Sequence, residues 1–263
     1  MHPSRLKHAT ARYFSLRYPV AWTEFCRAFR KHHFDAEYWL IPLFCQPDKI
    51  AIDVGANMGI YSYAMARHAR QVIAFEPNTD LWPFLRRFLG DRVRLEDAAL
   101  SDTAGEAEFR VVADNTGVAT IEPNNHLSMI DRRENIAVRP VTTRTLDSFG
   151  LTNVSFIKID VEGHEEAVLA GGRQTIVGSR PVVLVEAEDR HNPGAPRRVA
   201  EWFDEVEYEG FFVRDRRLVP VAELSLEDVD PAGLDRQVYI NNFIYLPGDN
   251  GVLIARVRAV VER

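Results

Sequence analysis

The chain has 263 residues, of which 46% are hydrophobic, and a net charge of −6, so it can bury one large core. Its two cysteines, Cys26 and Cys45, show no CxxC or Cys/His spacing, so neither a disulfide framework nor a zinc site is expected. No apolar run reaches the length of a membrane span and no signal-peptide pattern is present, so we expect a cytoplasmic protein without a membrane partner.

The amino-terminal segment differs in charge from the rest of the chain. Residues 1–34 carry seven Lys/Arg side chains and one acidic side chain, Glu24, which leaves the remainder near −12. Aromatic residues alternate with the basic ones, and we interpret residues 1–48 as a helical extension that docks on an acidic body, residues 49–263. An acidic body repels phosphates, so no nucleic-acid partner is expected, whereas exposed aromatic side chains would allow a homodimer.

From Lys49 onward, short apolar strands alternate with helical patterns. This alternation predicts an α/β fold with a mostly parallel sheet and helices on both faces. Two late strands, at residues 210–213 and 238–245, are typical of an antiparallel edge hairpin. The predicted strands of the alternating part are 49–54, 71–75, 92–95, 154–159 and 181–186, and the predicted helices are 60–68, 78–89, 146–149, 167–171 and 197–208.

The alternation breaks between residues 105 and 141. Strands are predicted at 107–112 and 137–141, and the polar stretch between them, 114–134, is too long for an ordinary loop. We interpret 105–141 as an insertion able to form a lid, in which His126 is a candidate contact for a substrate.

The first strand leads into the turn Asp53-Val54-Gly55-Ala56-Asn57-Met58-Gly59, which opens a helix. Glycines at positions 55 and 59 allow backbone to approach a ligand closely. Asn57 stands where a dinucleotide fingerprint has its middle glycine, and an acidic Asp53 repels phosphate but suits an ammonium or sulfonium group. The turn therefore favours a nucleoside with a cationic group over a dinucleotide.

The next two strands also end in candidate ligand contacts. Glu76 lies 21 positions beyond Gly55, the interval at which an acidic residue binds both ribose hydroxyls. Asp97-Ala98 follows the third strand, where a carboxylate and a backbone amide can bind an adenine edge. Each feature is weak alone, but in this order and each at a strand end they favour S-adenosylmethionine as the ligand.

The stretch from Lys158 to Glu165 joins a buried strand to a cluster of ionisable side chains. Transfer of a methyl group to a hydroxyl requires removal of a proton, and His164 is the first candidate for the base because histidine titrates near neutrality. Asp160 is the alternative, and Lys158 is placed to pair with it. Glu162 and Glu186 are candidate substrate contacts. Together with Asp160 they could also hold Mg²⁺, although no metal site is favoured.

Five motifs together resemble the FkbM family of methyltransferases. They are Ile52–Ser62, Phe75–Asn78, Ala98–Asp102, Thr145–Asp147 and Ile157–Glu165, in register over roughly residues 36–190. The resemblance implies a class I Rossmann-like methyltransferase fold with a seven-stranded sheet, S-adenosylmethionine as donor, and transfer to a hydroxyl oxygen of a natural product or sugar. The predicted cofactor-binding residues are Asp53, Gly55, Ala56, Asn57, Gly59, Glu76, Pro77, Asn78, Asp97, Ala98 and Asp160.

The sequence thus predicts an O-methyltransferase with a small-molecule or glycan acceptor. An NAD-dependent oxidoreductase shares the strand-helix-strand pattern and the ribose carboxylate, but the second glycine and a hydride-site pair are missing. A non-catalytic module that binds S-adenosylmethionine remains a third hypothesis. The sequence does not identify the acceptor.

Overall fold

The structure of the protein is a computed structural model that describes residues 20, 21, 23, 24, 35–112, 115–123, 125, 136–229 and 239–263. His126 and most of the predicted extension therefore lie outside the described residues. The described end of the extension is helical, as a 3-10 helix, Ala36–Leu40, followed by α3 (Ile41–Phe44). Leu40 and Phe44 are buried in the core of the main sheet, and a domain boundary at residue 48 stays a prediction.

The main sheet has the order β11-β10-β12-β9-β8-β1-β2-β3. Strands β3, β2, β1, β8 and β9 run parallel, and β12, β10 and β11 pair antiparallel at one side. β1, β8 and β12 are buried at every position, as expected of strands covered on both faces. The bounds are β1 (Ile50–Val54), β2 (Gln71–Phe75), β3 (Val93–Glu96), β8 (Val154–Ile159), β9 (Val182–Glu186), β10 (Tyr208–Arg214), β11 (Arg217–Pro220) and β12 (Asn242–Pro247).

The antiparallel side contains one strand more than predicted. The two late strands do pair, as β10 with β12, with Gly210 opposite Tyr245. The edge hairpin, however, is formed by β10 and β11. Its two-residue turn is Asp215-Arg216, with φ of 49° and 59°. Hairpin turns of this kind are usually signalled by Asn-Gly or Asp-Gly, so the sequence did not reveal β11, and the sheet has eight strands instead of seven.

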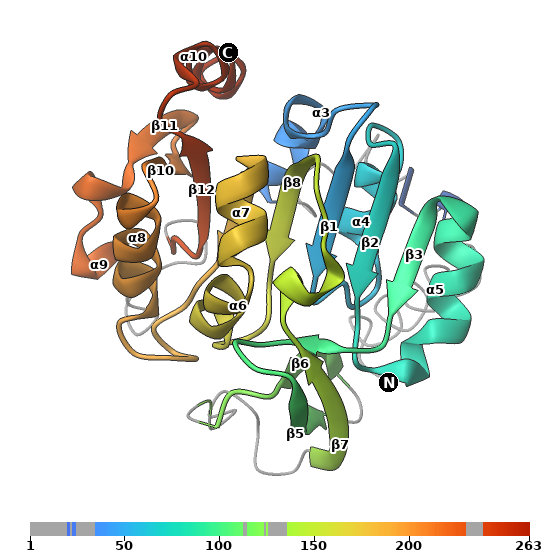
Figure 1. Cartoon of the computed structure of the whole chain (residues 1–263). Coiled ribbons are helices and arrows are strands. Elements are labelled where there is room, and N and C mark those ends of the chain that lie inside the picture. The colour runs from blue at the N-terminus through green and yellow to red at the C-terminus, as the bar shows by residue number, and fades with distance from the viewer. Residues whose placement is uncertain are drawn as a thin grey trace, which may run out of the picture.

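Helices cover both faces of the main sheet, as predicted (Figure 1). One face packs on α3, α4, α5 and α10, through residues such as Ala51 and Phe156. The other packs on α6, α7 and α8, through residues such as Ile52 and Ile157. Neighbouring residues of a strand point to opposite faces, which explains this division. The bounds are α4 (Ile60–Met65), α5 (Trp82–Leu89), α6 (Glu165–Gly171), α7 (Arg173–Ser179), α8 (Ala195–Glu205), α9 (Leu226–Val229) and α10 (Gly251–Val261).

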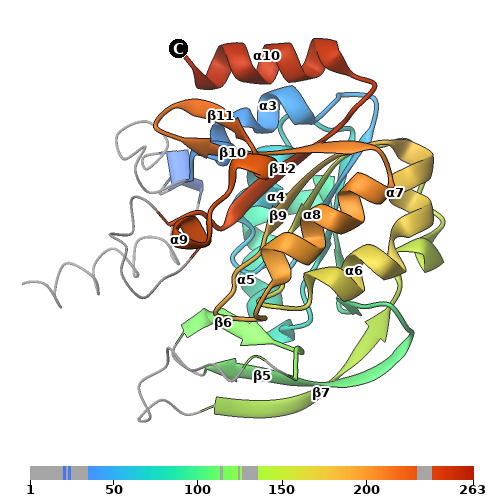
Figure 2. The same cartoon turned by 90° about the vertical axis from the view of Figure 1, so that its left-hand side faces the viewer.

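The predicted insertion forms a second sheet in the order β4-β7-β5-β6. Its bounds are β4 (Ala99–Leu100), β5 (Gly105–Val112), β6 (Asn115–Thr120) and β7 (Ile136–Arg144). Strand β6 lies in the stretch that was predicted to be a polar loop. Figures 1 and 2 show this inserted sheet beyond the carboxyl ends of β1, β2 and β8, the place that a lid would take.

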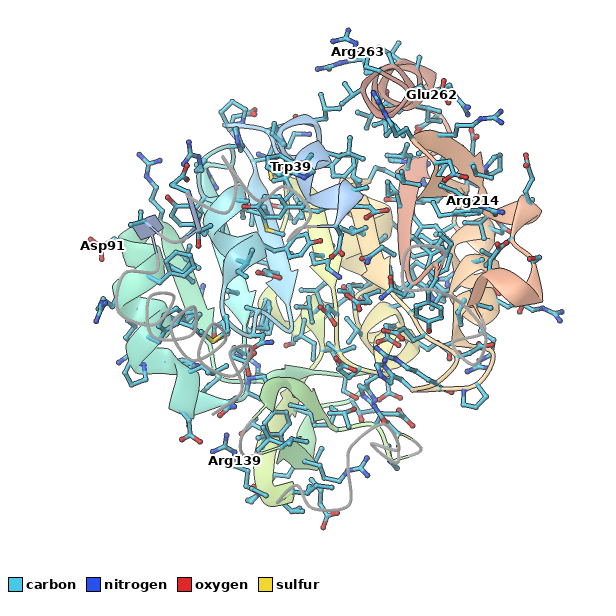
Figure 3. The ribbon with its side chains drawn as sticks, turned by 180° about the vertical axis from the view of Figure 1, so that it is seen from behind. Trp39, Asp91, Arg139, Arg214, Glu262 and Arg263 are labelled. Atoms are coloured by element: carbon cyan, nitrogen blue, oxygen red, sulfur yellow. The ribbon has the colours of Figure 1, made fainter. Side chains whose placement is uncertain are left out.

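One arginine joins the inserted sheet to the end of β2. Arg139, on β7, donates to Asn78 Oδ1 and, over 3.1 Å, to Asp80 Oδ2. Figure 3 shows Arg139 on the inserted sheet and Arg263 after α10 at opposite ends of the molecule.

In the part of the chain that the structure describes, no helix combines the length and apolar character needed to cross a membrane.

Candidate functional site

The glycines of the first turn serve packing within the protein. Gly55 has φ of 80°, and a Cβ atom there would lie 1.8 Å from the carbonyl oxygen of Asp160. A Cβ at Gly59, with φ of 73°, would lie 2.9 Å from Leu85. The sequence was interpreted as keeping these glycines for a ligand. In the structure Gly55 lets the turn after β1 meet the end of β8 and also lines the two pockets described below, while Gly59 lets α4 meet α5.

Glu76 is fixed at the end of β2 by two backbone groups. Its Oε2 accepts from the Asn57 N–H and its Oε1 from the Asn78 N–H, both over 2.7 Å. The side chain is buried, and burial raises the pKa of Glu76 to about 7 despite these hydrogen bonds. The carboxylate is thus held in one orientation beside the turn after β1, as the predicted ribose contact requires.

Asp53, the last acidic residue of β1, is also buried. Its Oδ2 accepts a 2.5 Å hydrogen bond from the Ser62 hydroxyl of α4. Burial raises the pKa of Asp53 to about 6, while the Ser62 hydrogen bond and the Lys158 ammonium oppose the increase. A cation brought close to Asp53 would therefore favour its charged form.

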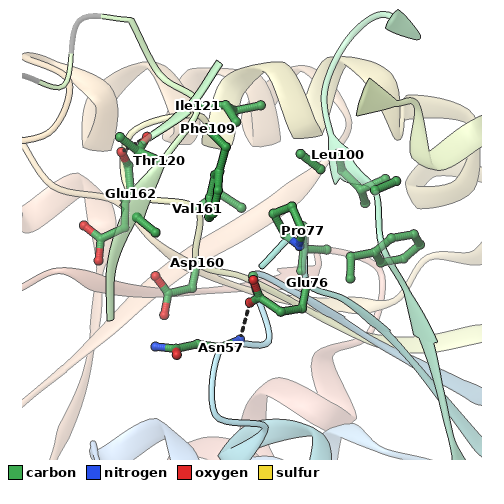
Figure 4. Close-up of a pocket in the computed structure, with 16 residues that line it drawn as sticks. Asn57, Glu76, Pro77, Leu100, Phe109, Thr120, Ile121, Asp160, Val161 and Glu162 are labelled. Carbon is green, nitrogen blue, oxygen red and sulfur yellow. Dashed lines mark hydrogen bonds between the residues drawn. The ribbon is translucent and has the colours of Figure 1, made fainter. Parts of the chain in front are cut away.

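A pocket of about 620 Å³ opens between the strand ends and the inserted sheet. Figure 4 shows Pro77 and Leu100 on one side of it, whereas the polar ends of Asn57, Asp160 and Glu162 point to the other. The pocket thus has an apolar half and a polar half. Its walls are formed by Val54, Gly55, Asn57, Phe75, Glu76, Pro77, Ala98, Ala99, Leu100, Phe109, Ala119, Thr120, Ile121, Asp160, Val161 and Glu162.

A second pocket of about 690 Å³ continues from the first and shares Gly55, Asn57 and Asp160 with it. Asp53 and Lys158 line this second pocket, together with aromatic and acidic residues from the described end of the extension. Two polar atoms at these pockets, Asn57 Oδ1 and the Tyr61 hydroxyl, are buried without a hydrogen-bond partner among the described residues. A polar ligand could satisfy both.

Lys158 is a buried cation between two carboxylates. Its Nζ lies 3.7 Å from Asp160 Oδ2 and 3.5 Å from Glu186 Oε2, and its side chain is 1% exposed. Burial alone would lower the pKa of Lys158, but the surrounding carboxylates, first of all Asp160 and Glu186, outweigh it and raise the pKa. Lys158 therefore stays charged and fixes Asp160 at the border of the two pockets.

The loop after β8 reverses direction at two residues with positive φ, Glu162 at 55° and Gly163 at 108°. The Glu162 carbonyl accepts from Thr120 Oγ1 over 2.9 Å and from Asn125 Nδ2 over 2.7 Å, so the inserted sheet and the loop that follows β6 hold it. The Glu162 carboxylate lines the first pocket, and its Oε2 lies 2.9 Å from His191 Nδ1.

His164 lies on the other side of the same loop. Its Nδ1 is 3.0 Å from Glu122 Oε2 and its Nε2 is 2.9 Å from Ser101 Oγ, so both ring nitrogens have partners in the protein. His164 lines neither pocket. The pockets lend no support to the prediction of His164 as the base, because its ring nitrogens are already bound within the protein.

The predicted cofactor-binding residues fall into four groups. Asn57, Glu76, Pro77, Ala98 and Asp160 line the first pocket, as predicted for a cofactor site. Ala56 lines the second pocket. Asn78 is buried behind Glu76, with its side chain bound to Arg139. Asp97 is exposed and lines neither pocket.

Two carboxylates of the alternative magnesium site, Asp160 and Glu186, flank Lys158. Lys158 occupies the space between Asp160 and Glu186, and a cation there takes the place of a metal. In the described part of the chain, no group of three or more His, Cys, Asp or Glu side chains is arranged to hold a metal ion. The predicted substrate contact Glu186 also accepts from Asn241 Nδ2 over 2.9 Å.

The sequence interpretation missed His191, Thr120 and the partners of His164. His191 follows β9 in the segment Glu188-Asp189-Arg190-His191-Asn192, which matches no motif. A weak signal was available, because ionisable residues just after a parallel strand lie at the ligand-binding edge of the sheet.

Known proteins resemble this chain over most of the region described above. The Methyltransferase FkbM domain family matches residues 53–213. The 2-O-methyltransferase NoeI of Sinorhizobium fredii is 31% identical over 157 residues, which cover 54% of this chain and 64% of NoeI. The AMB antimetabolite synthetase AmbE of Pseudomonas aeruginosa is 26% identical over 211 residues, which cover 65% of this chain and 10% of AmbE.

The chain therefore spans less than two thirds of the length of either curated relative. Among solved structures, the FkbM methyltransferase of Methylobacillus flagellatus KT aligns with a TM-score of 0.48 and 15% identity, covering 76% of this chain and 44% of that one.

Proposed function

The chain belongs to the FkbM family of methyltransferases, and from this premise we propose that it transfers a methyl group from S-adenosylmethionine to a hydroxyl oxygen of a small molecule or glycan. NoeI, a relative at 31% identity, is a 2-O-methyltransferase, which supports oxygen as the acceptor atom. The net charge of −6 favours such an acceptor over a nucleic acid.

The assignment of S-adenosylmethionine as the methyl donor rests mainly on the Glu76 carboxylate. Each of its oxygens already accepts one backbone N–H, and each keeps a lone pair for one hydroxyl of a ribose. The apolar half of the first pocket, with Pro77 and Leu100, suits the flat adenine ring. These features fit the nucleoside part of S-adenosylmethionine.

The second pocket fits the amino-acid part of the donor. Asp53 and Asp160 line it, so its charge suits an ammonium group. The unpartnered Asn57 Oδ1 offers that group a further acceptor. A pyrophosphate would instead face these carboxylates, which disfavours a dinucleotide.

Asp160 lies where the two pockets meet. When bound, S-adenosylmethionine supplies a methyl group made electrophilic by its sulfonium sulfur. Asp160, held by the buried Lys158 ammonium, borders both pockets, and its carboxylate attracts the positive charge of the sulfonium. Phe109, Ala119 and Thr120 of the inserted sheet line the same pocket.

Calorimetric titration tests the donor. We expect S-adenosylmethionine and S-adenosylhomocysteine to bind and NAD not to bind. Glu76→Ala should weaken the binding of both nucleosides roughly 100-fold or more, because it removes two charge-assisted hydrogen bonds. Glu106→Ala, an exposed change on β5, serves as the matched control. Binding of NAD alone would overturn the proposal.

Transfer itself is measured with methyl-labelled S-adenosylmethionine and a panel of methyl glycosides and phenols, with mass spectrometry of the products. A product labelled on nitrogen or carbon in a mixed-acceptor panel would contradict oxygen as the acceptor atom. Turnover should survive exhaustive chelation. Loss of turnover that Mg²⁺ restores would show that a metal is required.

A further inference from the structure

Two Glu–His pairs of nearly equal geometry lie on either side of the loop after β8. In one, Glu162 Oε2 is 2.9 Å from His191 Nδ1, and in the other, Glu122 Oε2 is 3.0 Å from His164 Nδ1. The histidine side chains are 13% and 14% exposed. Only the first pair borders the pocket, through Glu162. The two pairs therefore have the same chemistry in different places.

The backbone forces Glu162 into its place. A non-glycine residue at φ of 55° is uncommon, and such residues gather at functional sites. Thr120 and Asn125 hold its carbonyl, which leaves the side chain free to point toward the pocket. In Figure 4 the carboxylate of Glu162 points to the same side as that of Asp160. Glu162 thus faces the part of the pocket that the methyl group and the acceptor would share.

His191 is held equally firmly behind Glu162. Its backbone N–H donates to the Glu188 carbonyl over 3.1 Å, and its own carbonyl packs on Gly163, where a Cβ atom would lie 3.1 Å away. The next residue, Asn192, donates to the Gly163 carbonyl over 3.0 Å. These contacts hold the turn after β9 against the loop after β8, and the Glu162–His191 pair lies between the two segments.

Several charged groups face this pair. Burial raises the pKa of Glu162, and His191 opposes the increase. Burial alone would lower the pKa of His191, but Glu162 outweighs it and raises this pKa. The other charged groups that face the pair are Asp160 and Glu165 from the β8 side and Glu186, Glu188 and Arg190 from the β9 side.

We propose that the Glu162–His191 pair is the proton acceptor for the methyl acceptor's hydroxyl, with Glu162 as the catalytic residue and His191 as the residue that positions and charges it. This assignment rests on the proposed function. The hydroxyl O–H bond breaks and its proton passes to Glu162 and on to His191. The oxygen bonds to the methyl carbon, and the carbon–sulfur bond breaks with its electron pair on sulfur. The positive charge lost from sulfur reappears on the pair, so the net charge of the site is unchanged.

The proposal can be tested before the methyl acceptor is identified, because it predicts that protons are released when S-adenosylmethionine binds. The sulfonium charge of S-adenosylmethionine should drive a proton off the pair on binding, whereas the neutral thioether of S-adenosylhomocysteine should not. Calorimetric titrations of both compounds near neutral pH, in two buffers of different ionisation enthalpy, count the protons released. We expect S-adenosylmethionine to release more protons per site than S-adenosylhomocysteine.

Three glutamine variants test whether the Glu162–His191 pair is the source of this difference in proton release. Glu162→Gln and His191→Gln should each remove at least half of it, since neither amide accepts the proton although both keep a hydrogen-bonding group of similar size. Glu122→Gln makes the same chemical change in the pair outside the pocket and should leave the difference intact. Binding of S-adenosylhomocysteine by all variants verifies that they are folded.

The outcomes separate the two proposals. A proton difference equal to that of the wild type in both Glu162→Gln and His191→Gln would overturn the assignment of the pair and leave the proposed function standing. Equal loss in Glu122→Gln would also overturn it. If neither nucleoside binds the wild-type protein, the proposed function fails, and the assignment fails with it.

Discussion

The two faces of the loop from Asp160 to His164 use the same kind of side chain for different purposes. On the pocket face, Glu162 is paired with His191 and borders a space large enough for a ligand. On the inner face, His164 is bound through both ring nitrogens, to Glu122 and to Ser101. The comparison shows that a Glu–His pair is a candidate for proton transfer only where one member reaches a cavity. Elsewhere it holds segments together.

The largest expected effect is on turnover and belongs to the pocket face. Glu162→Gln should lower kcat roughly 10²- to 10⁴-fold, the usual contribution of a general base, while affinity for S-adenosylhomocysteine stays within about threefold. Rates with an acceptor found in the glycoside and phenol panel, together with calorimetry, measure both quantities. A kcat within tenfold of the wild type would contradict the role of Glu162.

The second effect is on stability and belongs to the inner face. His164→Ala should lower the free energy of unfolding by about 1–3 kcal/mol, because it leaves the Glu122 carboxylate and the Ser101 hydroxyl without this partner in a largely buried place. Urea unfolding measures the change. His191→Ala, which removes one such contact, should cost less, and the reverse order would contradict the division between the two faces.

A third prediction concerns pH and Glu165, which follows the loop. Its Oε1 accepts from the Gly163 N–H over 2.9 Å, and burial raises its pKa from 4.5 to about 7. Because the folded-state pKa is the higher one, its stabilising contribution is complete below pH 4.5 and is lost as pH rises through 7. Stability should therefore fall between about pH 5 and 8, and Glu165→Gln should reduce that fall by about 1–2 kcal/mol in urea titrations.

An unchanged pH dependence in Glu165→Gln would show that other carboxyls dominate. Glu76, whose pKa burial also raises to about 7, is the first of these. Glu76→Gln, measured in the same way, separates the two contributions.

The smallest predicted effect is at Thr120, which touches both faces. Its hydroxyl donates to the Glu162 carbonyl and accepts from the Glu122 N–H, each over 2.9 Å. Thr120→Val keeps the shape and removes both contacts, so kcat should fall about fivefold. Thr142→Val, the same change at an exposed residue of β7, is the control. A full loss of turnover would mean that Thr120 itself contacts the reacting groups.

The parallel strands and their ends could be predicted from the sequence, because apolar runs and the residues that follow them are local signals. Asp53, Glu76 and Asp160 were placed correctly at neighbouring strand ends for this reason. The partners of His164 could not be predicted, because Glu122 and Ser101 lie 42 and 63 positions away from it in the sequence.

The surroundings of His164 could not be predicted for a related reason. Its direction depends on the positive φ of Glu162 and Gly163, and a non-glycine residue gives no sign in the sequence that it adopts such a conformation. His191 was missed because its relation to Glu162 exists only once β8 and β9 lie side by side. Motifs thus located the loop correctly but did not show which of its faces borders the pocket.

The most direct test of this division is a crystal structure with S-adenosylhomocysteine bound. We predict that the ribose hydroxyls lie within hydrogen-bond distance of both Glu76 oxygens, that adenine lies on the Pro77 and Leu100 side, and that sulfur lies on the side of Asp160 and Glu162. A nucleoside that does not contact Glu76, or one with its sulfur directed toward Leu100, would contradict the account.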